Sequence, residues 1–409
     1  MSNAFEKASL VMLPHAYEEG KLYSLKPTDR SGDFTFSRGA DTATRVNEQG
    51  YIEVVTDLNA PRLDYGGGAT CPSLLLEPQR TNIARNDFGF NGFGGCTVAS
   101  EVTANPFGDT TDVFSATFTS GGGFRLNESP ILVSGTTYCM GHFMKFNNSA
   151  ITISASGASA SILSASGNFS FDASGNPSKT GDVYFIEYPN GWYYVYALTN
   201  AIADGGTRVN WNESSGSILV YKTQYEAGSY PTSYIPTNGS AQTRPAESCV
   251  VNGAASSIGQ TEGTMFLDFV YEANGGGFYG SYVANATGFS DFVGWRVPDN
   301  KTTLDILIRY NNAYQVLHTV ASVFAVGNRY KVALKYSSGD IKVFVNNQEK
   351  YSSTATYTTP SVPLSKHTIS GNGVGTIDSF QQDTISKVNQ SILYPTALSD
   401  DECIALTTL

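Results

Sequence analysis

The stretch Arg329-Tyr-Lys-Val-Ala-Leu-Lys-Tyr-Ser-Ser-Gly-Asp-Ile-Lys-Val-Phe-Val-Asn346 holds the clearest strand pattern of the chain. From Tyr330 to Tyr336, large apolar side chains at every second position alternate with a face that carries two lysines, which is typical of a half-buried strand with one solvated face. A turn at Ser337-Ser-Gly-Asp340 follows, and the alternation resumes from Ile341 to Val345. The stretch therefore predicts an antiparallel hairpin of fixed register.

Similar runs occupy the middle of the chain, at residues 138–146, 183–196 and 217–225. Within the second run, Pro189-Asn190-Gly191 is a strong hairpin signal, and it predicts Trp192, Tyr194 and Tyr196 on one face of the following strand. Since no amphipathic helices separate these strands, the pattern favours an antiparallel sandwich. Residues 237–262 are rich in turn-forming residues and predict a boundary to a second β unit. Near the end, Ser399-Asp-Asp-Glu402 matches a capping box and predicts a short helix that carries Ile404 and Leu406.

Composition excludes several classes of protein. The 409 residues are 41% hydrophobic and 15% charged and include 41 glycines, which indicates a folded, turn-rich protein. A net charge of −11 opposes binding to nucleic acid, because phosphate recognition needs clustered cations. The N-terminus lacks the pattern of a cleaved signal, and no apolar run reaches the ~18 residues of a membrane span, so we expect no membrane insertion.

The cysteines indicate a reducing site of synthesis. They are odd in number and widely spaced, with no C-x-x-C pair, and we expect them to be buried free thiols rather than disulfides or zinc ligands. They are Cys71, Cys96, Cys139, Cys249 and Cys403.

Several segments resemble known families. The hairpin at 329–346 and the ending Ile392-Leu-Tyr-Pro-Thr-Ala-Leu-Ser-Asp-Asp-Glu402 resemble the laminin-G-like or concanavalin A-like lectin/glucanase sandwich. Residues 135–237, with Gln224-Tyr-Glu-Ala-Gly-Ser-Tyr-Pro-Thr-Ser-Tyr-Ile-Pro236, resemble the carbohydrate-binding-module-like jelly rolls of bacteriophage tail and fibre proteins. The N-terminal run Leu74-Leu-Leu-Glu-Pro-Gln-Arg-Thr-Asn82 is similar to the leading segment of such phage proteins.

Catalytic constellations are not evident in the sequence. The resembled glucanases carry two glutamates and an aspartate in an E-x-D-x-x-E strand, but the matching strand Phe266-Leu-Asp-Phe-Val-Tyr271 keeps Asp268 alone, and a retaining glycosidase needs two carboxyls. The four histidines show no metal-ligand spacing, and His142 is expected to be a core residue. A triad assembled from distant residues stays open. We expect no metal site, although a calcium loop that uses Asp340 or Asp291 stays an alternative to solvated turn carboxylates.

Aromatic side chains are the candidates for glycan binding, because flat rings and a few polar groups recognise sugars. Trp192 directly follows a tight turn on an alternating strand and is expected in the core. Trp211 and Trp295 have polar neighbours in the sequence, and Tyr310 precedes Asn311-Asn312 in an expected turn, so these three are predicted to be exposed ligand-binding platforms.

Together these observations predict an all-β chain of two tandem antiparallel β-sandwiches. The expected parts are an N-terminal virion-attachment segment (1–90), a carbohydrate-binding-module-like jelly roll (91–245) and a concanavalin A-like/laminin-G-like sandwich (246–409). The resemblance implies a non-catalytic bacteriophage virion protein of the fibre or decoration type, made in the host cytoplasm, that binds host-surface glycan or other virion proteins as a homo-oligomer, by analogy a trimer. The alternatives are a capsule-degrading glycan lyase or hydrolase, and a purely architectural virion connector.

Overall fold

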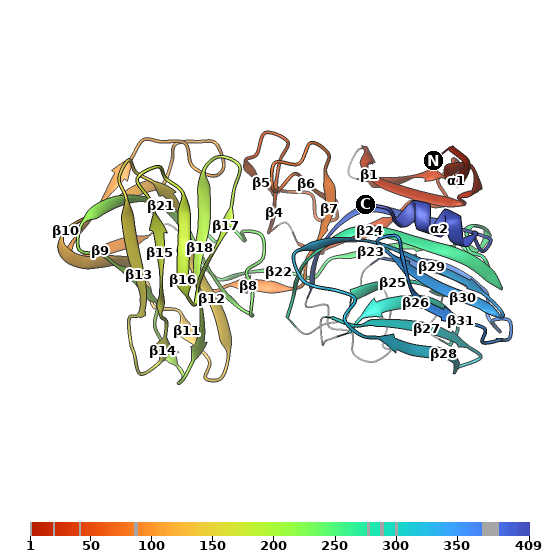
Figure 1. The fold of residues 1–409 in the computed structure, drawn as a ribbon. Helices are drawn as coiled ribbons and strands as arrows, with labels where there is room; N and C mark the ends of the chain where they lie inside the picture. The colour runs from red at the N-terminus through yellow and green to blue at the C-terminus, as the bar shows by residue number, and fades with distance from the viewer. Residues whose placement is uncertain are drawn as a thin grey trace.

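The chain is built almost entirely from antiparallel β-strands (Figure 1). The computed structural model describes residues 2–18, 21–40, 42–85, 89–275, 279–286, 290–298, 302–369 and 384–409. Two large β units lie side by side, and a small group of N-terminal strands sits at the junction between them. The prediction of an all-β fold with two antiparallel sandwiches is confirmed.

The C-terminal sandwich packs two sheets around one core. One sheet has the order β2 (Lys21–Lys26), β1 (Leu10–Glu18), β33 (Thr384–Tyr394), β24 (Glu262–Asn274), β29 (Asn328–Ser337), β30 (Asp340–Val345) and β31 (Gln348–Ser353), with β7 (Ser73–Leu76) pairing β33 and β6 (Arg62–Asp64) pairing β7. The other has the order β28 (Ala313–Val320), β27 (Leu304–Tyr310), β26 (Phe292–Val297), β25 (Tyr279–Asn285), β32 (Leu364–Thr368), β23 (Ser248–Asn252) and β3 (Thr35–Ser37). Buried side chains of both sheets form the shared core.

The middle unit is a second β unit, with strands that wrap around their own core. Its strand order is β14 (Leu163–Ser164), β18 (Trp192–Ala201), β12 (Thr137–Phe146), β21 (Gly216–Ala227), β10 (Val113–Leu126), β20 (Val209–Asn212), β13 (Ile151–Gly157), β15 (Gly167–Phe171) and β16 (Pro177–Gly181). Strand β17 (Val183–Glu187) pairs β18, and β9 (Phe90–Glu101) pairs β10. The predicted hairpin at Pro189-Asn190-Gly191 is confirmed, and Trp192 is fully buried.

Strand β10 connects the two halves of this unit. Its first part pairs β21, and its last part pairs β20. Between the two parts lies Gly122, with φ of +138°. A Cβ atom there would lie 2.3 Å from the Phe93 carbonyl oxygen of β9. Only glycine fits this bend, because the partner strand approaches too closely for any side chain.

The hairpin predicted at residues 329–346 is confirmed as β29 and β30. The capping box is confirmed as well, since Ser399 and Glu402 exchange hydrogen bonds at the start of α2 (Asp400–Thr407). The prediction that the lysine face of β29 is exposed to solvent is wrong at Lys335. That lysine is buried, and its Nζ lies 2.6 Å from Asp400 of the helix, because α2 covers this face.

Residues 1–90 are not a structural unit of their own. Strand β1 pairs β33 in one sheet of the C-terminal sandwich, and β3 pairs β23 in the other. Helix α1 (Ser2–Lys7) lies beside α2, so the two termini are neighbours (Figure 1). The expected boundary at residue 90 therefore cuts through both sheets, because the strand pattern showed where strands form but not which ones pair.

Short elements complete the fold. They are the pairs β4 (Ala43–Val46) with β5 (Ile52–Val55), β8 (Arg80–Asn82) with β22 (Gln242–Arg244), β11 (Ile131–Leu132) with β19 (Gly205–Gly206), and the 3-10 helix η1 (Ala255–Ser257). The cysteines are free thiols and are buried as expected, except for Cys71, which is exposed. Within the described ranges, none of the helices has the length and apolar character needed to cross a bilayer.

Candidate functional site

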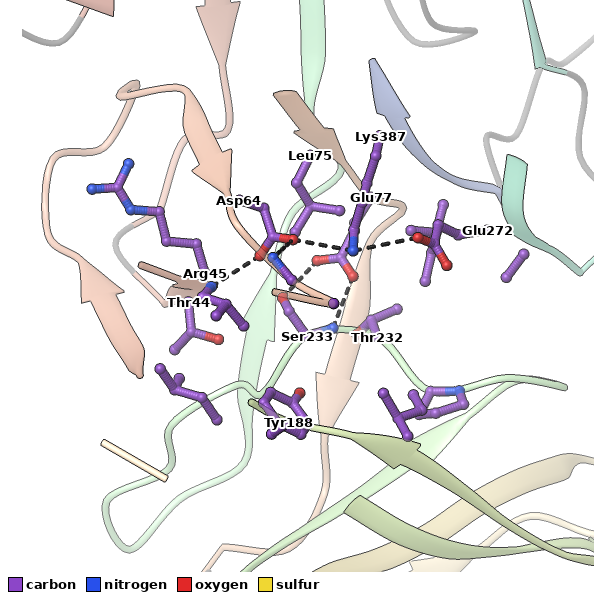
Figure 2. Close-up of a pocket in the computed structure, with 18 of the residues that line it drawn as sticks. Thr44, Arg45, Asp64, Leu75, Glu77, Tyr188, Thr232, Ser233, Glu272 and Lys387 are labelled. Atoms are coloured by element: carbon purple, nitrogen blue, oxygen red, sulfur yellow. Dashed lines mark hydrogen bonds and ion pairs between the residues drawn. The ribbon is translucent and has the colours of Figure 1, made fainter. Parts of the chain in front are cut away.

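A cavity of about 310 Å³ opens where the N-terminal strands, the β17–β18 hairpin and the C-terminal sandwich meet (Figure 2). Every one of these three parts contributes side chains to it. The residues that line it are Thr44, Arg45, Val46, Ile52, Asp64, Gly66, Gly67, Leu75, Glu77, Ile186, Glu187, Tyr188, Pro189, Tyr196, Tyr230, Pro231, Thr232, Ser233, Glu272, Ala273, Ile385 and Lys387. The volume lies in the range of small-molecule sites, which occur preferentially where domains meet.

One side of the cavity is apolar and aromatic. Leu75, Tyr230, Ala273 and Ile385 form a small buried cluster from the N-terminal strands, the connecting loop and the C-terminal sandwich. The β17–β18 hairpin adds the rings of Tyr188 and Tyr196. This side offers the flat, rigid surface against which a ligand with apolar C–H faces can pack.

The Tyr196 ring is held by its strand neighbours. It stacks on Tyr184, its cross-strand partner, with ring centroids 5.6 Å apart, and on Tyr194 at 5.8 Å. Tyr184 itself does not line the cavity. Alternation along β18 places Trp192, Tyr194 and Tyr196 in one cluster, as the sequence predicts.

Another part of the cavity lining is charged and is organised around Lys387 of β33 (Figure 2). Lys387 Nζ lies 3.1 Å from Asp64 Oδ2 and 3.3 Å from Glu272 Oε1. Asp64 also accepts hydrogen bonds from the backbone amides of Val46 at 2.9 Å and Gly66 at 3.0 Å. Burial alone would lower the pKa of Lys387, but Asp64 and Glu272 raise it above its ordinary value, so the ammonium stays charged.

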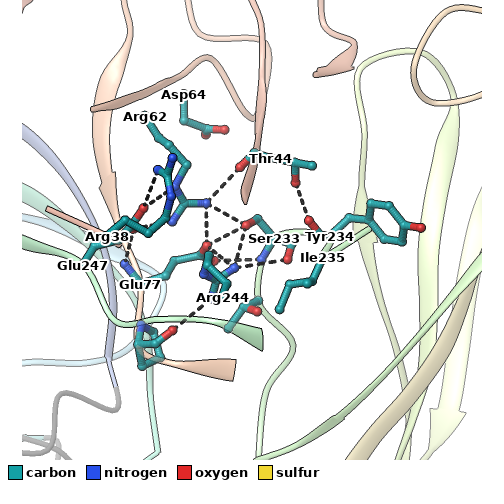
Figure 3. Close-up of polar contacts among 12 residues, drawn as sticks. Arg38, Thr44, Arg62, Asp64, Glu77, Ser233, Tyr234, Ile235, Arg244 and Glu247 are labelled. Atoms are coloured by element: carbon teal, nitrogen blue, oxygen red, sulfur yellow. Dashed lines mark hydrogen bonds and ion pairs between the residues drawn. The ribbon is translucent and has the colours of Figure 1, made fainter. Parts of the chain in front are cut away.

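Glu77 forms the deep end of the charged side and belongs to a buried ion network (Figure 3). Its carboxylate lies 2.7 Å from Arg62 Nη1 and 2.9 Å from Arg244 Nη1, and it accepts hydrogen bonds from the amide and hydroxyl of Ser233. Burial alone would raise its pKa, but Arg244, Arg62 and Ser233 together lower the pKa of Glu77 to about 2. Glu77 is therefore a permanently ionised structural group.

A second carboxylate completes the network behind the cavity. Glu247 forms a two-point ion pair with Arg62, and Arg38 Nη1 lies 3.4 Å from its Oε1. All of these side chains are essentially inaccessible to solvent. Removing one partner from such a network is costly, because a buried charge is left without compensation. The network therefore fixes the N-terminal strands against the segment that connects the two units.

Two sequence motifs singled out in the sequence, Glu-Pro-Gln-Arg-Thr-Asn and Pro-Thr-Ser-Tyr-Ile-Pro, meet at this junction. Glu77 and Asn82 come from the Glu-Pro-Gln-Arg-Thr-Asn run, and Ser233 and Ile235 come from the Pro-Thr-Ser-Tyr-Ile-Pro run. Asn82 Nδ2 donates to the Ile235 carbonyl oxygen at 3.0 Å, and Ser233 bonds Glu77 as described above. Both motifs therefore serve the connection between units, and both supply part of the cavity lining, Glu77 from the first and Thr232 and Ser233 from the second.

The three platforms expected from the sequence lie elsewhere and are buried. Trp211 belongs to the core of the middle unit, while Trp295 and Tyr310 belong to the core of the C-terminal sandwich, and all three have 0% exposed surface. The prediction that they are exposed is wrong. Polar neighbours in the sequence were misleading, because residues next to one another on a strand point to opposite faces of the sheet.

The remaining chemical candidates have structural partners. Asp268 forms a two-point ion pair with Arg329, at 2.8 and 2.6 Å, and accepts a hydrogen bond from Asn389. His142 is fully buried, and its Nδ1 lies 2.8 Å from Thr223 Oγ1. Burial lowers the pKa of His142 to about 3, so the ring is neutral at physiological pH.

The two aspartates considered for calcium are also engaged. Asp291 Oδ1 accepts hydrogen bonds from the backbone amides of Asn311 and Ser361, both at 2.9 Å, and Asp340 pairs with Lys335 at 2.8 Å. Asp291 is buried, whereas the sequence predicted a solvated turn carboxylate. Among the described residues, no group of three or more His, Cys, Asp or Glu side chains is arranged to hold a metal ion.

Sequence reasoning missed the cavity because its polar residues are far apart in the chain. Asp64, Glu272 and Lys387 come from strands β6, β24 and β33, which only the fold brings together. The available signal was indirect, since the Glu-Pro-Gln-Arg-Thr-Asn and Pro-Thr-Ser-Tyr-Ile-Pro runs combine proline with buried polar residues. Such runs indicate a specific loop packing, but not the presence of a cavity beside it.

Comparisons with known proteins complete the description of the chain. No family model matches it, and no curated protein matches it. Among solved structures, it is similar to the CBM40 of the Ruminococcus gnavus IT-sialidase bound to alpha2,3 sialyllactose, with 16% identity and a TM-score of 0.31 over 38% of this chain and 86% of that one. A mutant Trypanosoma rangeli sialidase displaying trans-sialidase activity matches with 15% identity and a TM-score of 0.31, over 39% of this chain but only 25% of its own length. The Caenorhabditis elegans galectin LEC-6 matches with 12% identity and a TM-score of 0.26, over 35% of this chain and 88% of that one.

Proposed function

We propose that the chain is a non-catalytic glycan-binding protein and that the junction cavity is its binding site. The observation that carries this proposal is the pairing of an aromatic side, from Tyr188, Tyr196 and Tyr230, with a charged side around Lys387. Sugars need both surfaces, since their C–H faces pack on rings while their hydroxyls take hydrogen bonds from a few fixed polar groups.

Two features support binding rather than catalysis. A glycosidase needs a protonated carboxyl as general acid beside a second carboxylate. Glu77 is held ionised by Arg62 and Arg244, with its pKa lowered to about 2. Asp64 and Glu272 both pair with the ammonium of Lys387, so each carboxylate already has an ion-pair partner.

A hydrolase or lyase is the second candidate, because Asp64 and Glu272 both lie within 3.3 Å of the same nitrogen and so form a pair of acids in one cavity. Incubation with capsular polysaccharides distinguishes the two functions. Binding without release of new reducing ends supports a binding protein. Release that is abolished in Glu272→Gln would instead establish an enzyme.

We further propose that the protein acts in a bacteriophage virion, as a homo-oligomer that presents several copies of the cavity to host-surface glycan. This part rests on the resemblance of the two motif runs to phage tail and fibre proteins. Display of linked copies raises avidity by about 10²–10⁴ over a single weak site. Immunogold labelling of purified particles tests it: label at defined positions supports the virion role, and unlabelled particles contradict it.

The binding function is tested with a glycan array and the full chain. Tyr196→Ala removes the ring that lines the cavity, and Tyr184→Ala removes its stacking partner outside the cavity. The two variants are matched in ring type and partial burial and lie on paired strands. We expect Tyr196→Ala to weaken the affinity for the most tightly bound glycan about tenfold or more, which corresponds to about 1.4 kcal/mol. Tyr184→Ala should have a much smaller effect on that affinity. Equal effects, or no bound glycan on the array, would contradict the proposal.

A further inference from the structure

The charges that line the junction cavity are unevenly balanced. Lys387 lies between Asp64 and Glu272, so this trio carries one net negative charge. The other charged residues of the lining are mostly compensated from outside it. Glu77 is paired with Arg62 and Arg244, and Arg45 is paired with Glu53. Glu187 at the exposed rim adds a further negative charge.

The lysine is already committed to its two partners. A ligand carboxylate that approached Lys387 would have to displace Asp64 or Glu272, or else lie within a few ångströms of both. Asp64 is only 5% exposed, so losing the ammonium would leave a buried carboxylate uncompensated. Placing like charges together in a partly buried site opposes binding strongly.

Hydrogen-bond donor groups on a ligand, in contrast, are attracted to these carboxylates. Among the described residues, Glu272 is paired through Oε1 alone, and its side chain is 36% exposed. Its second carboxylate oxygen is thus available to a hydroxyl or an ammonium group. The surroundings of Tyr188 are also negative. Burial and the charges of Asp64, Glu77 and Glu226 raise the pKa of its hydroxyl above the ordinary value.

We infer that the cavity accepts the end of a glycan that carries hydroxyl or amino groups and no negative charge, and that Asp64 and Glu272 exclude sugars that bear a carboxylate. Neutral hexoses and hexosamines with a free amine are thus the ligand class, and uronic and sialic acids are rejected. This inference rests on the proposed glycan-binding function and specifies its substrate class.

The test is an array of matched glycans that differ only at the terminal sugar, which is a hexose, a hexosamine with a free amine, or a uronic or sialic acid. The full chain is expected to bind the neutral and amino forms at least tenfold more tightly than the carboxylated forms. Since exposed charges are screened by salt, the discrimination should decrease between low and high ionic strength.

The variant Glu272→Gln removes the negative charge and keeps the side-chain shape. It is expected to reduce discrimination against carboxylated sugars at least threefold. Glu349→Gln is the matched control, because Glu349 forms a comparable exposed pair with Lys342 at 3.2 Å and lies outside the cavity lining. That control should keep the preference of the unmodified chain.

The outcomes separate the inference from the function on which it rests. If carboxylated glycans bind as tightly as neutral ones, and Tyr196→Ala abolishes that binding, the cavity binds glycans and the charge inference is overturned. If Glu272→Gln leaves the discrimination unchanged, the assigned role of Glu272 is overturned. If none of the glycans binds, the proposed function fails and the inference fails with it.

Discussion

Lys387 Nζ lies 3.1 Å from Asp64 Oδ2 and so connects strand β33, in the last part of the chain, to strand β6 of the N-terminal region. The contact is part of the cavity lining and depends on both strands being in place. The candidate site is therefore a product of the whole fold. Residues 91–409 alone would lack Asp64, Glu77 and the strands that hold them.

The buried ion network should dominate the stability of the junction. Replacing Arg62 by Met leaves Glu247 and Glu77 with fewer cations in a site closed to solvent, and we expect a loss of about 3–5 kcal/mol in unfolding free energy. Urea denaturation measures it. Arg85→Met is the control, because Arg85 pairs with Glu128 on the surface and its loss should cost below about 1 kcal/mol. Equal urea midpoints for Arg62→Met and Arg85→Met would show that the buried network does not stabilise the fold.

Truncating the buried tryptophans should affect folding before it affects binding. Because Trp211 and Trp295 are fully buried, Trp211→Ala and Trp295→Ala should each lower the unfolding free energy by about 3–5 kcal/mol. Tyr314→Ala, at a site 41% exposed, serves as the surface control and should leave the thermal midpoint nearly unchanged. A tryptophan variant with unchanged stability and lost glycan binding would restore the exposed-platform hypothesis.

Acid should weaken the middle unit through His142. Burial lowers the pKa of His142 to about 3, whereas the pKa of a histidine in the unfolded chain is near its ordinary value of about 6.5. Below pH ~6.5 the unfolded chain therefore binds a proton at His142 that the folded chain does not bind. The free energy of unfolding is unaffected by His142 above that pH and decreases as the pH falls toward 3. At pH 5 the loss is about 2 kcal/mol.

Urea midpoints at pH 7 and pH 5 measure this effect. His142→Gln should be less stable at pH 7 but should show a smaller fall between the two pH values. His367 remains in that variant, and burial lowers its pKa to about 4, so some acid sensitivity should persist in the C-terminal sandwich. An unchanged fall in His142→Gln would mean that other groups cause the acid response.

The helix α2 should depend on its capping box. Ser399→Ala removes the hydroxyl that accepts from the Glu402 amide, and it should cost about 1 kcal/mol. Hydrogen exchange of the amides in α2 measures the effect locally. Faster exchange is expected there and not in β12. Uniform exchange rates across both elements would contradict a local capping role.

Local patterns predicted the strands well and the site poorly. The alternation from Tyr330 to Tyr336 and the turn at Pro189-Asn190-Gly191 are local signals, and both gave the observed hairpins. The pairing of β1 with β33 is a long-range relationship that no local period encodes. Trp211 was misplaced for a related reason, since its exposure depends on which face of β20 meets the core.

Glycan binding in the junction cavity can be observed in a structure. The decisive measurement is a crystal structure of the full chain with the glycan that binds most tightly on the array. We expect a sugar ring packed on Tyr196, with its hydroxyl or amino groups within hydrogen-bond distance of Glu272. An ordered glycan at any other surface, with the cavity occupied by water alone, would contradict it.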